Sequence, residues 1–584
     1  MKIQIQYKIS IILLLAGIQT IFAQKKEENI GSEVVNIVKP YTPTISDAFK
    51  VKESPNLNDE DNVSKAVITY SILPFPVAST FEPSKGKAAG VDKAKQEALY
   101  SNYLIGGFGN YFTPLAELYV THDLGNDDYV AGMVKYISSA GGIEDIPVDD
   151  GYMKSSIDLT YGKNQNNMSW STSLGFQAQK YHWYGLPSDI SDSYTTDDLS
   201  TVFNTVDEPQ FYNNFYIGGK LKVNEGIFKE LSLEYDRFWD AFTTTENRFV
   251  AYPSFVFDVS HETIKTDFIV DYVGGSFDNF YDANQTTEYG FANFGISPSF
   301  AMQRDDWSFN IGATLMYSMD TQHSDDNIFI YPEINASYNV VDDLMIFYAG
   351  VTGGLEQNSY RNFTNENPFI SPSIYITPTN KQYDVFAGLK GKFTNTISYN
   401  IKGAFKNEKN FTMFKSNDYS INIDNPEYAF GNSFGVVYDD VQTLNFFGEI
   451  KGSLSNDISF GIKGTFSSYN AQNQPEVWNL PAVEFGANLD SQITEKWSAG
   501  VEFFYVGERK DLQINNSINY VVAPIATTLE SYFDMNANVK YQHSDRLSGF
   551  LRLNNLTNQG YQKWLNYPVQ SFQFMLGAAY KFDF

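Results

Sequence analysis

The chain has 584 residues, no cysteine and a formal net charge of −28. This acidity excludes a nucleic-acid-binding surface, which needs basic residues against backbone phosphates, and the missing cysteine excludes disulfides, a cysteine metal site and a lipid-modified N-terminal cysteine. Hydrophobic residues make up 42%, aromatic residues 16% and charged residues 19% of the chain, a profile shared by transmembrane β-barrels and by β-rich soluble proteins.

The first 23 residues have the order of a secretory signal peptide. Lys2 and Lys8 form a short basic region, residues 9–18 form an apolar run, and the small residue Ala23 precedes Gln24 at the predicted cleavage point. Downstream, no window approaches the roughly 18 to 20 apolar residues that a transmembrane helix needs. The mature chain is therefore predicted to be either soluble outside the inner membrane or inserted as strands.

Residues 24–99 differ from the rest of the chain. They are rich in proline and end in a basic stretch that includes Lys85, Lys87, Lys93 and Lys95. They lack the regular apolar pattern that would bury a core of their own. We interpret them as an extended periplasmic or lumen-lining segment and not as an independent domain.

From about Tyr100 to Phe584 the sequence repeats one pattern, in which apolar and polar residues alternate. The last run is the clearest, because Phe572, Phe574, Leu576 and every second residue after them to Phe584 are apolar or aromatic. Period two places these residues on one face of a strand. Succession of such runs over nearly the whole remaining chain predicts an all-β fold, a transmembrane antiparallel barrel of about 22 strands.

The connections between the runs alternate in length. Tight polar turns are predicted at 125–127, 164–167, 304–306, 342–343, 394–396, 455–457 and 494–496. Longer loops are predicted at 138–149, 184–210, 320–327, 357–371, 416–431, 470–476 and 512–526. Short periplasmic turns and long extracellular loops are typical of outer-membrane barrels. An even strand count, which requires residues 432–455 to be a single strand interrupted near Asp439 and Asp440, places both barrel ends on the short-turn side.

Several short motifs follow one another in the C-terminal third. They are Phe447-Gly448-Glu449 in a strand, the turn 455–457, Pro481 after a loop, residues 506–509 at a strand end, residues 553–558 before Tyr561, and the closing Phe584. Their order and spacing resemble the last strands of TonB-dependent receptor barrels. The resemblance implies a 22-stranded barrel that takes up a scarce ligand such as a metal chelate, a vitamin or a glycan, driven by an inner-membrane energy complex.

The N-terminal part departs from that family. The family's barrels are filled by a folded plug preceded by an energy-coupling box, whereas only residues 24–99 stand before the first predicted strand, with residues 33–38 as a faint coupling-box candidate. Two functions therefore stay open. The first is uptake of a small ligand; the second is a plug-less structural or partner-docking barrel in an outer-membrane complex. The lumen would be closed by residues 24–99, by infolded loops or by another protein.

The sequence indicates no enzyme, no cofactor and no metal centre. The histidines His122, His182, His261, His323 and His543 lie far apart and have no partner at metal-ligand spacing. Paired carboxylates such as Asp305-Asp306 and Asp439-Asp440 are interpreted as solvated. The acidic loop with Asp189, Asp192, Asp197 and Asp198 offers the oxygen ligands that calcium prefers, but solvated carboxylates explain it more simply.

Aromatic residues gather in the predicted extracellular loops, and they are the candidate ligand-binding residues. They are Tyr181, Trp183, Tyr184, Trp478, Tyr561 and Trp564. Aromatic rings above a barrel mouth can stack on a ligand. The alternative, which is favoured, is the aromatic girdle, in which Tyr and Trp lie at headgroup depth.

The resemblance also implies partners. Tyr580, Phe582 and Phe584 of the closing strand are the predicted recognition signal for the barrel-assembly machinery. The other expected partners are outer-membrane lipid and either a TonB-type energy complex or an outer-membrane protein that seals the lumen. The predicted location is the outer membrane.

Overall fold

The computed structural model describes residues 100–584 apart from 260–261, 280, 282–285, 419–421 and 513–525. The predicted signal peptide (1–23), the proline-rich segment (24–99) and the coupling-box candidate (33–38) lie outside the described residues.

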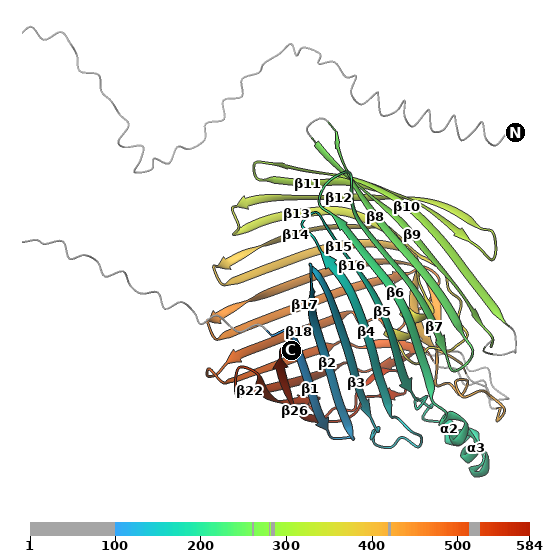
Figure 1. The fold of residues 1–584 in the computed structure, drawn as a ribbon. Helices are drawn as coiled ribbons and strands as arrows, with labels where there is room; N and C mark the ends of the chain where they lie inside the picture. Colours follow the sequence, from blue (N-terminus) through green and yellow to red (C-terminus); the bar gives the residue numbers. More distant parts are fainter. Residues whose placement is uncertain (1–99, 260–261, 280, 282–285, 419–421, 513–525) are drawn as a thin grey trace, which may run out of the picture. The chain divides into compact units, whose positions relative to one another are not determined.

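The described residues form one closed antiparallel barrel of 22 strands. Strand β1 (Asn102–Gly109) pairs on one side with β2 (Thr113–Gly125) and on the other with the last strand, β26 (Gln573–Phe582). β1 and β26 lie side by side in Figure 1, in blue and dark red respectively. Closure leaves no edge strand with unpaired backbone groups, which is what a bilayer requires of a sheet. The predicted fold class and strand count are confirmed.

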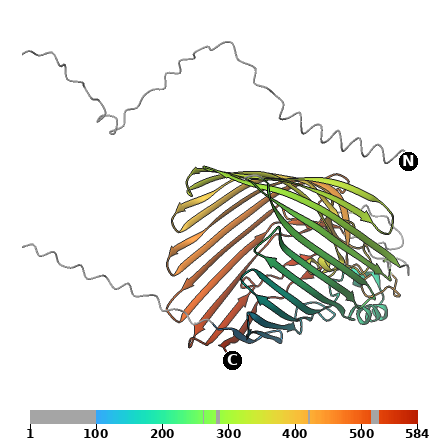
Figure 2. The same ribbon diagram turned by 45° about the horizontal axis from the view of Figure 1, so that its top comes forward.

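The remaining barrel strands follow one another around the wall, each antiparallel to the one before it, and they run obliquely around the barrel (Figure 2). They are β3 (Asp128–Ser139), β4 (Tyr152–Asn164), β5 (Met168–Tyr181), β6 (Gln210–Val223), β7 (Phe228–Asp240), β8 (Thr245–Val259), β9 (Glu262–Phe277), β10 (Thr287–Arg304), β11 (Trp307–Asp320), β12 (Asp326–Val341), β13 (Met345–Glu356), β14 (Thr379–Thr394), β15 (Ile397–Ser416), β16 (Phe434–Ser455), β17 (Ile458–Ala471), β18 (Val483–Gln492), β19 (Trp497–Val506), β22 (Tyr532–Gln542) and β23 (Leu547–Asn554).

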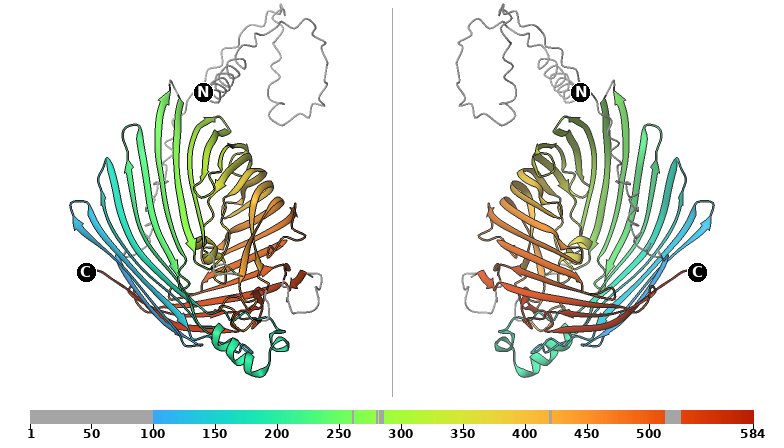
Figure 3. Two further views of the ribbon diagram at one scale, coloured as in Figure 1. Left: turned by 90° about the vertical axis from the view of Figure 1, so that its right-hand side faces the viewer. Right: turned by 90° about the vertical axis from the view of Figure 1, so that its left-hand side faces the viewer.

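The other elements belong to the long loops at one end of the barrel. They are the helices α2 (Ile190–Ser193), α3 (Thr196–Val206) and α4 (Tyr360–Glu366), and the hairpins β20 (Arg509–Leu512) with β21 (Ala526–Leu529) and β24 (Gln562–Trp564) with β25 (Tyr567–Pro568). Figure 3 shows α2 and α3 in teal at this end. Within the described part of the chain, no helix has the length and apolar character needed to cross a membrane.

Alternation along each strand separates two faces. Leu233 and Tyr235 on β7 are each 38% exposed and point outward. Asp236 on the same strand, which pairs with β6 and β8, is 3% exposed and lies on the inner face. The same outward apolar row recurs on strand after strand, with Phe446, Val501 and Leu576 as further examples. An outer surface made of apolar side chains suits lipid, and the barrel is an outer-membrane protein.

The turns agree with the predicted alternation of lengths. At the β2–β3 turn, Asn126 and Asp127 have φ of 57° and 69°, the left-handed backbone that a two-residue type I′ hairpin needs. Residues 434–455 form one strand, β16, and the partner strand β15 is irregular between Glu408 and Phe411, opposite Asp439. The single strand keeps the count even, as predicted, so the long loops share the extracellular end.

Candidate functional site

The long loops fold inward and pack into one aromatic cluster at the extracellular end, which we call the loop core. Its buried members come from the ends of β6, β7, β9, β10, β15 and β16, from α3 and α4, from the loops around them, and from β21, β24 and β25. They are Trp183, Val202, Val206, Tyr212, Phe238, Val273, Phe277, Tyr289, Phe291, Tyr360, Phe363, Phe369, Ile370, Ile374, Ile376, Phe414, Tyr428, Ala429, Phe430, Phe434, Leu529, Trp564, Leu565 and Tyr567. Because they come from strands around most of the rim, the loop core lies across the barrel mouth.

Hydrogen bonds between side chains and distant backbone join the loops of the loop core. The Tyr567 hydroxyl donates to the Asn432 carbonyl oxygen at 2.5 Å, and the Asn432 side-chain amide donates to the Trp183 carbonyl oxygen at 3.0 Å. The Tyr184 hydroxyl donates to the Pro568 carbonyl oxygen at 3.1 Å. Three separate loops are thus held to one another, and the polar backbone of each is satisfied inside an apolar cluster.

A smaller cluster lies beside the loop core and contains Met413, Val441, Trp478 and Leu512. Its polar centre is Asp511 on β20, which is fully buried. The carboxylate of Asp511 accepts hydrogen bonds from the Ser416 backbone N–H at 2.9 Å and from the Asn479 side chain at 2.8 Å. Burial raises the pKa of Asp511 to about 6, although these donors oppose the shift.

Asp439 corrects one interpretation of the sequence. Its pairing with Asp440 suggested a solvated carboxylate, but the side chain is 3% exposed. It accepts hydrogen bonds from the backbone N–H groups of Asn473 and Gln474, at 2.8 and 2.7 Å. The interpretation was wrong because the β17–β18 loop folds back over this carboxylate and supplies the donors that water would otherwise provide.

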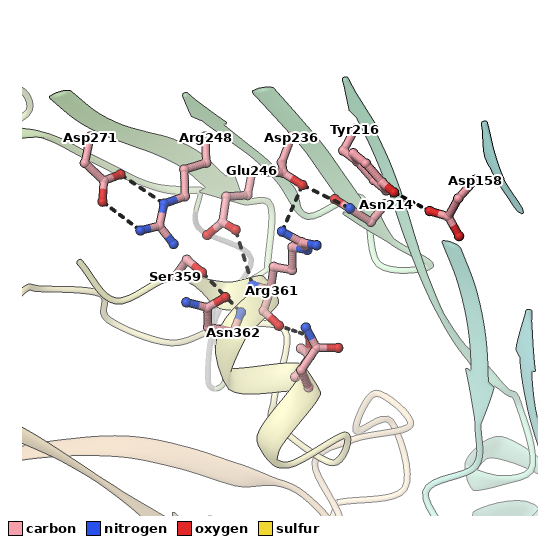
Figure 4. Close-up of polar contacts among 12 residues, drawn as sticks. Asp158, Asn214, Tyr216, Asp236, Glu246, Arg248, Asp271, Ser359, Arg361 and Asn362 are labelled. Carbon is pink, nitrogen blue, oxygen red and sulfur yellow. Dashed lines mark hydrogen bonds and ion pairs between the residues drawn. The ribbon is translucent and has the colours of Figure 1, made fainter. Parts of the chain in front are cut away.

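Helix α4 lies on the inner wall formed by β6 to β9 (Figure 4). Ser359 precedes it in extended conformation and accepts a hydrogen bond from the Asn362 backbone N–H at 3.1 Å, as an N-cap residue does. The first two helical N–H groups, of Tyr360 and Arg361, donate to the Glu246 carboxylate at 2.7 and 3.3 Å. A wall carboxylate therefore satisfies the free donors of the helix start.

Side chains add two further bonds between α4 and the wall. The Arg361 guanidinium forms an ion pair with Asp236 at 2.8 Å, and the Tyr360 hydroxyl donates to Asp240 at 2.9 Å. Both wall carboxylates are nearly inaccessible, at 3% and 6% exposure. The loop that carries α4 is thus tied to the wall through charges removed from water, and such ties are strong only while both partners stay in place.

Five of the six predicted ligand-binding aromatics belong to these two clusters or pack against them, and Tyr561 does not. Trp183 and Trp478 are each 1% exposed and Trp564 is 7% exposed. Tyr181 and Tyr184 pack against the loop core, and Tyr561 stacks on Tyr532 with ring centroids 3.9 Å apart. The structure brings Trp183, Trp564 and the two tyrosines together, and it places Trp478 and Tyr561 apart from them. Ligand binding by these residues stays a prediction.

The favoured alternative for these aromatics, the girdle, is wrong for the three tryptophans. A girdle residue faces lipid at headgroup depth, whereas Trp183, Trp478 and Trp564 are enclosed by loop residues. The error has a physical cause: sequence shows that a residue follows a strand, but not that its loop turns inward over the mouth.

Sequence reasoning missed all three helices of the described residues, as well as the carboxylates beneath α4. A signal existed for α3, because Thr195 accepts from the Asp198 backbone N–H at its start, a capping arrangement visible as Thr-x-x-Asp. That helix places Asp197 and Asp198, two residues of the predicted calcium-loop alternative, in its first turn. Among the residues that the structure describes, no group of three histidine or acidic side chains is arranged to hold a metal ion.

No family model matches the sequence, and no curated protein matches it. Among solved structures, the chain is similar to the siderophore receptor PirA from Acinetobacter baumannii, at 12% identity over 84% of this chain and 81% of that one, with a TM-score of 0.62. It is also similar to the ferripyoverdine receptor of the Pseudomonas aeruginosa outer membrane, at 12% identity over 84% and 73%, with a TM-score of 0.60.

The copper transporter OprC matches at 12% identity over 84% of this chain and 82% of that one, with a TM-score of 0.57. Likeness at such low identity shows the fold alone. The chain has the 22-stranded barrel of the TonB-dependent receptors, as the C-terminal motifs predicted.

Proposed function

We propose that this chain is an outer-membrane uptake barrel for a scarce small ligand, of the metal-chelate, vitamin or glycan class. The proposal is supported by the fold, since the similar structures are named as siderophore receptors and a copper transporter. A barrel of 22 strands is wide enough to need a closure. Uptake driven by a TonB-type energy complex is part of the proposal.

The observation that carries the proposal is the loop core across the mouth. Loops from strands around most of the rim meet there and hold one another by side-chain contacts. A barrel that served only as a scaffold would not need loops tied across its own entrance. Segments with few backbone pairings and many side-chain ties can open locally while the wall stays folded, and this is what gated uptake requires.

An uptake experiment tests the proposal. Cells with and without the chain are compared for accumulation of ferric siderophores, copper, cobalamin and maltodextrins at limiting concentration, before and after an uncoupler of the proton-motive force. The expected result is uptake of one class that depends on the chain and stops with the uncoupler. Equal accumulation of every class in both strains would contradict the proposal.

Planar-bilayer conductance tests the docking alternative, with the full chain compared with a variant that lacks residues 25–95. Low conductance from both proteins is expected, because the loop core remains in each. A sharp rise on deletion would assign the closure to the N-terminal segment and would still agree with uptake. High conductance from the full chain in the absence of any other protein would favour the docking barrel, whose lumen another protein must seal.

A further inference from the structure

A stretch of the inner wall beneath α4 is rich in carboxylates. Five of them come from strands β4, β7, β8 and β9, and one wall arginine, Arg248, lies among them. They are Asp158 on β4, Glu234 and Asp236 on β7, Glu246 on β8 and Asp271 on β9. Asp236 lies directly opposite Tyr216 on β6 and Arg248 on β8 in the strand register. We call this stretch the acidic wall.

Among the described residues, the wall's own arginine forms no hydrogen bond or ion pair with Asp236 or Glu246. The Arg248 guanidinium donates two hydrogen bonds to Asp271, at 2.9 and 2.7 Å, and so is taken by that carboxylate. The cationic partner of Asp236 is Arg361, which arrives on a loop 125 positions further along the chain, and Glu246 is met by the N–H groups of α4. In Figure 4 the Arg361 side chain points from α4 into this wall.

The loop leaves part of the acidic wall unsatisfied. Asn214 is 3% exposed and donates its amide to Asp236 at 3.1 Å, yet its own carbonyl oxygen Oδ1 has no hydrogen-bond partner among the described residues. The buried Nε of Arg361 likewise has no acceptor there. A buried polar atom without a partner is costly. An acceptor left free beside a carboxylate suits a cation that carries several N–H donors.

We propose that the acidic wall is a cation-binding site, that Arg361 occupies it while the mouth is closed, and that a ligand bearing a guanidinium or ammonium group opens the loop by taking its place. The inference deepens the proposed uptake function, on which it rests, by naming the charge of the ligand group that enters. When α4 leaves, five carboxylates and one arginine line this part of the passage.

The physical basis is competition for one site. A ligand shifts a two-state equilibrium only through its different affinity for the two states. Asp236, Glu246 and Asp271 of the acidic wall are 2–6% exposed while Arg361 is in place. An outside cation therefore reaches these three carboxylates only in the open state. Loss of Arg361 also removes the cationic partner of Asp236 in the closed state, where a buried carboxylate without a counter-charge is strongly unfavourable.

A reversible cross-link tests whether α4 must move. The side chains of Gln179 on β5 and Asn365 at the end of α4 are hydrogen bonded at 3.2 Å, and the chain has no cysteine of its own. The double variant Q179C/N365C is joined with a cleavable bismaleimide and reconstituted in planar bilayers. Methylguanidinium at millimolar concentration should raise the conductance of this variant after the linker is cleaved, but not while the linker is intact. The control is the same concentration of sodium chloride.

A charge variant completes the test. Arg361→Gln should shift the closed-to-open ratio toward the open state by on the order of 100-fold, make the current cation-selective and abolish the methylguanidinium response. Arg237→Gln is the matched control, since Arg237 lies on the same strand as Asp236 but bonds Asn247 on the other face of the wall.

Unchanged conductance in Arg361→Gln, an anion-selective current, or a methylguanidinium response that survives the intact cross-link would overturn the proposal. These readouts need no transported ligand, so their failure leaves the uptake experiment to decide the proposed function separately.

Discussion

The strand wall and the loop core differ in what joins their parts. In the wall, each strand pairs with two neighbours through backbone hydrogen bonds. The pairing of β15 with β16, for example, begins at Ile397 and ends at Ser416 of β15. In the loop core, a single backbone bridge joins Ile370 to Phe434, and further joins run from side chains to distant backbone, as from Tyr567 to Asn432, 135 positions apart. The wall repeats one interaction many times, whereas the loop core depends on single contacts between particular residues.

The difference separates the roles of the two regions. Removal of one side chain from the wall leaves the backbone ladder intact, so the barrel stays closed. Removal of one tie from the loop core frees a loop that few other bonds hold. Regions that open in function are drawn from the less stable parts of a fold, which suits a gate mounted on a rigid wall.

The largest effect is expected at Tyr567, whose ring stacks on Phe369 with centroids 3.6 Å apart. Tyr567→Ala should destabilise the loop core by about 3–5 kcal/mol, whereas Tyr567→Phe should cost about 1 kcal/mol through the lost hydrogen bond. Hydrogen exchange should show faster opening of the loops in the alanine variant. Equal acceleration in the wall strands would mean that the two regions do not open separately.

The wall is best tested at a matched pair on β19. Val501 is 41% exposed on the lipid face at the middle of the strand, and Glu502 next to it lines the lumen. Val501→Arg should destabilise the barrel by about 2–4 kcal/mol in a bilayer. Glu502→Arg should cost far less, because water fills that side. Urea unfolding in lipid vesicles measures both, and similar costs would contradict the assigned faces.

Asp511 makes the smaller cluster sensitive to pH. Its pKa is about 6 in the folded protein and 3.8 when unperturbed, so the folded state holds its proton more tightly. Stability contributed by this group is therefore fully present below about pH 4 and falls as pH rises toward and through 6. The total loss is about 1.4 kcal/mol for each unit by which the folded and unfolded pKa values differ. Proteolysis of the β19–β22 loop should be faster at pH 7.5 than at pH 5.

The matched variant for this prediction is Asp511→Asn, which cannot ionise. Its loop should be cut at nearly the same rate at the two pH values. A pH dependence that persists in the variant would assign the effect to another group.

The smallest effect is expected at the end of the closing strand. Phe584 is 82% exposed, next to Phe582 with ring centroids 5.5 Å apart. If Tyr580, Phe582 and Phe584 form the signal read by the assembly machinery, deletion of Phe584 should lower the outer-membrane level of the chain. Asp583→Asn should leave that level unchanged. Equal levels of the two variants in membrane fractions would count against the signal.

The wall could be predicted from the sequence because its information is local. Alternation of residues such as Leu233, Glu234 and Tyr235 shows which side chains share a face, and each face has one surrounding, lipid or lumen. Turn residues such as Asn126 and Asp127 mark where a strand reverses. Strand number, closure and the side of the long loops follow from these repeated signals.

The candidate site could be predicted only in part. The sequence indicated aromatic residues in the loops, but not that Trp183 and Trp564 meet in one core. No sequence pattern singled out Arg361, which lies in a loop without other signals, or Asp236, which is one of many inward-facing residues. Their 2.8 Å ion pair joins positions 125 apart, and no local pattern encodes a contact of that range.

By itself, then, the sequence determined a chain of about 22 alternating strands, with short turns at one end and long loops at the other; secretion stays a prediction. The tertiary structure alone decided that the loops turn inward, that α4 rests on the inner wall, and that the aromatics face one another instead of lipid. The physical reason is that strand faces are set by a two-residue period, whereas inward packing of loops depends on buried contacts between distant segments.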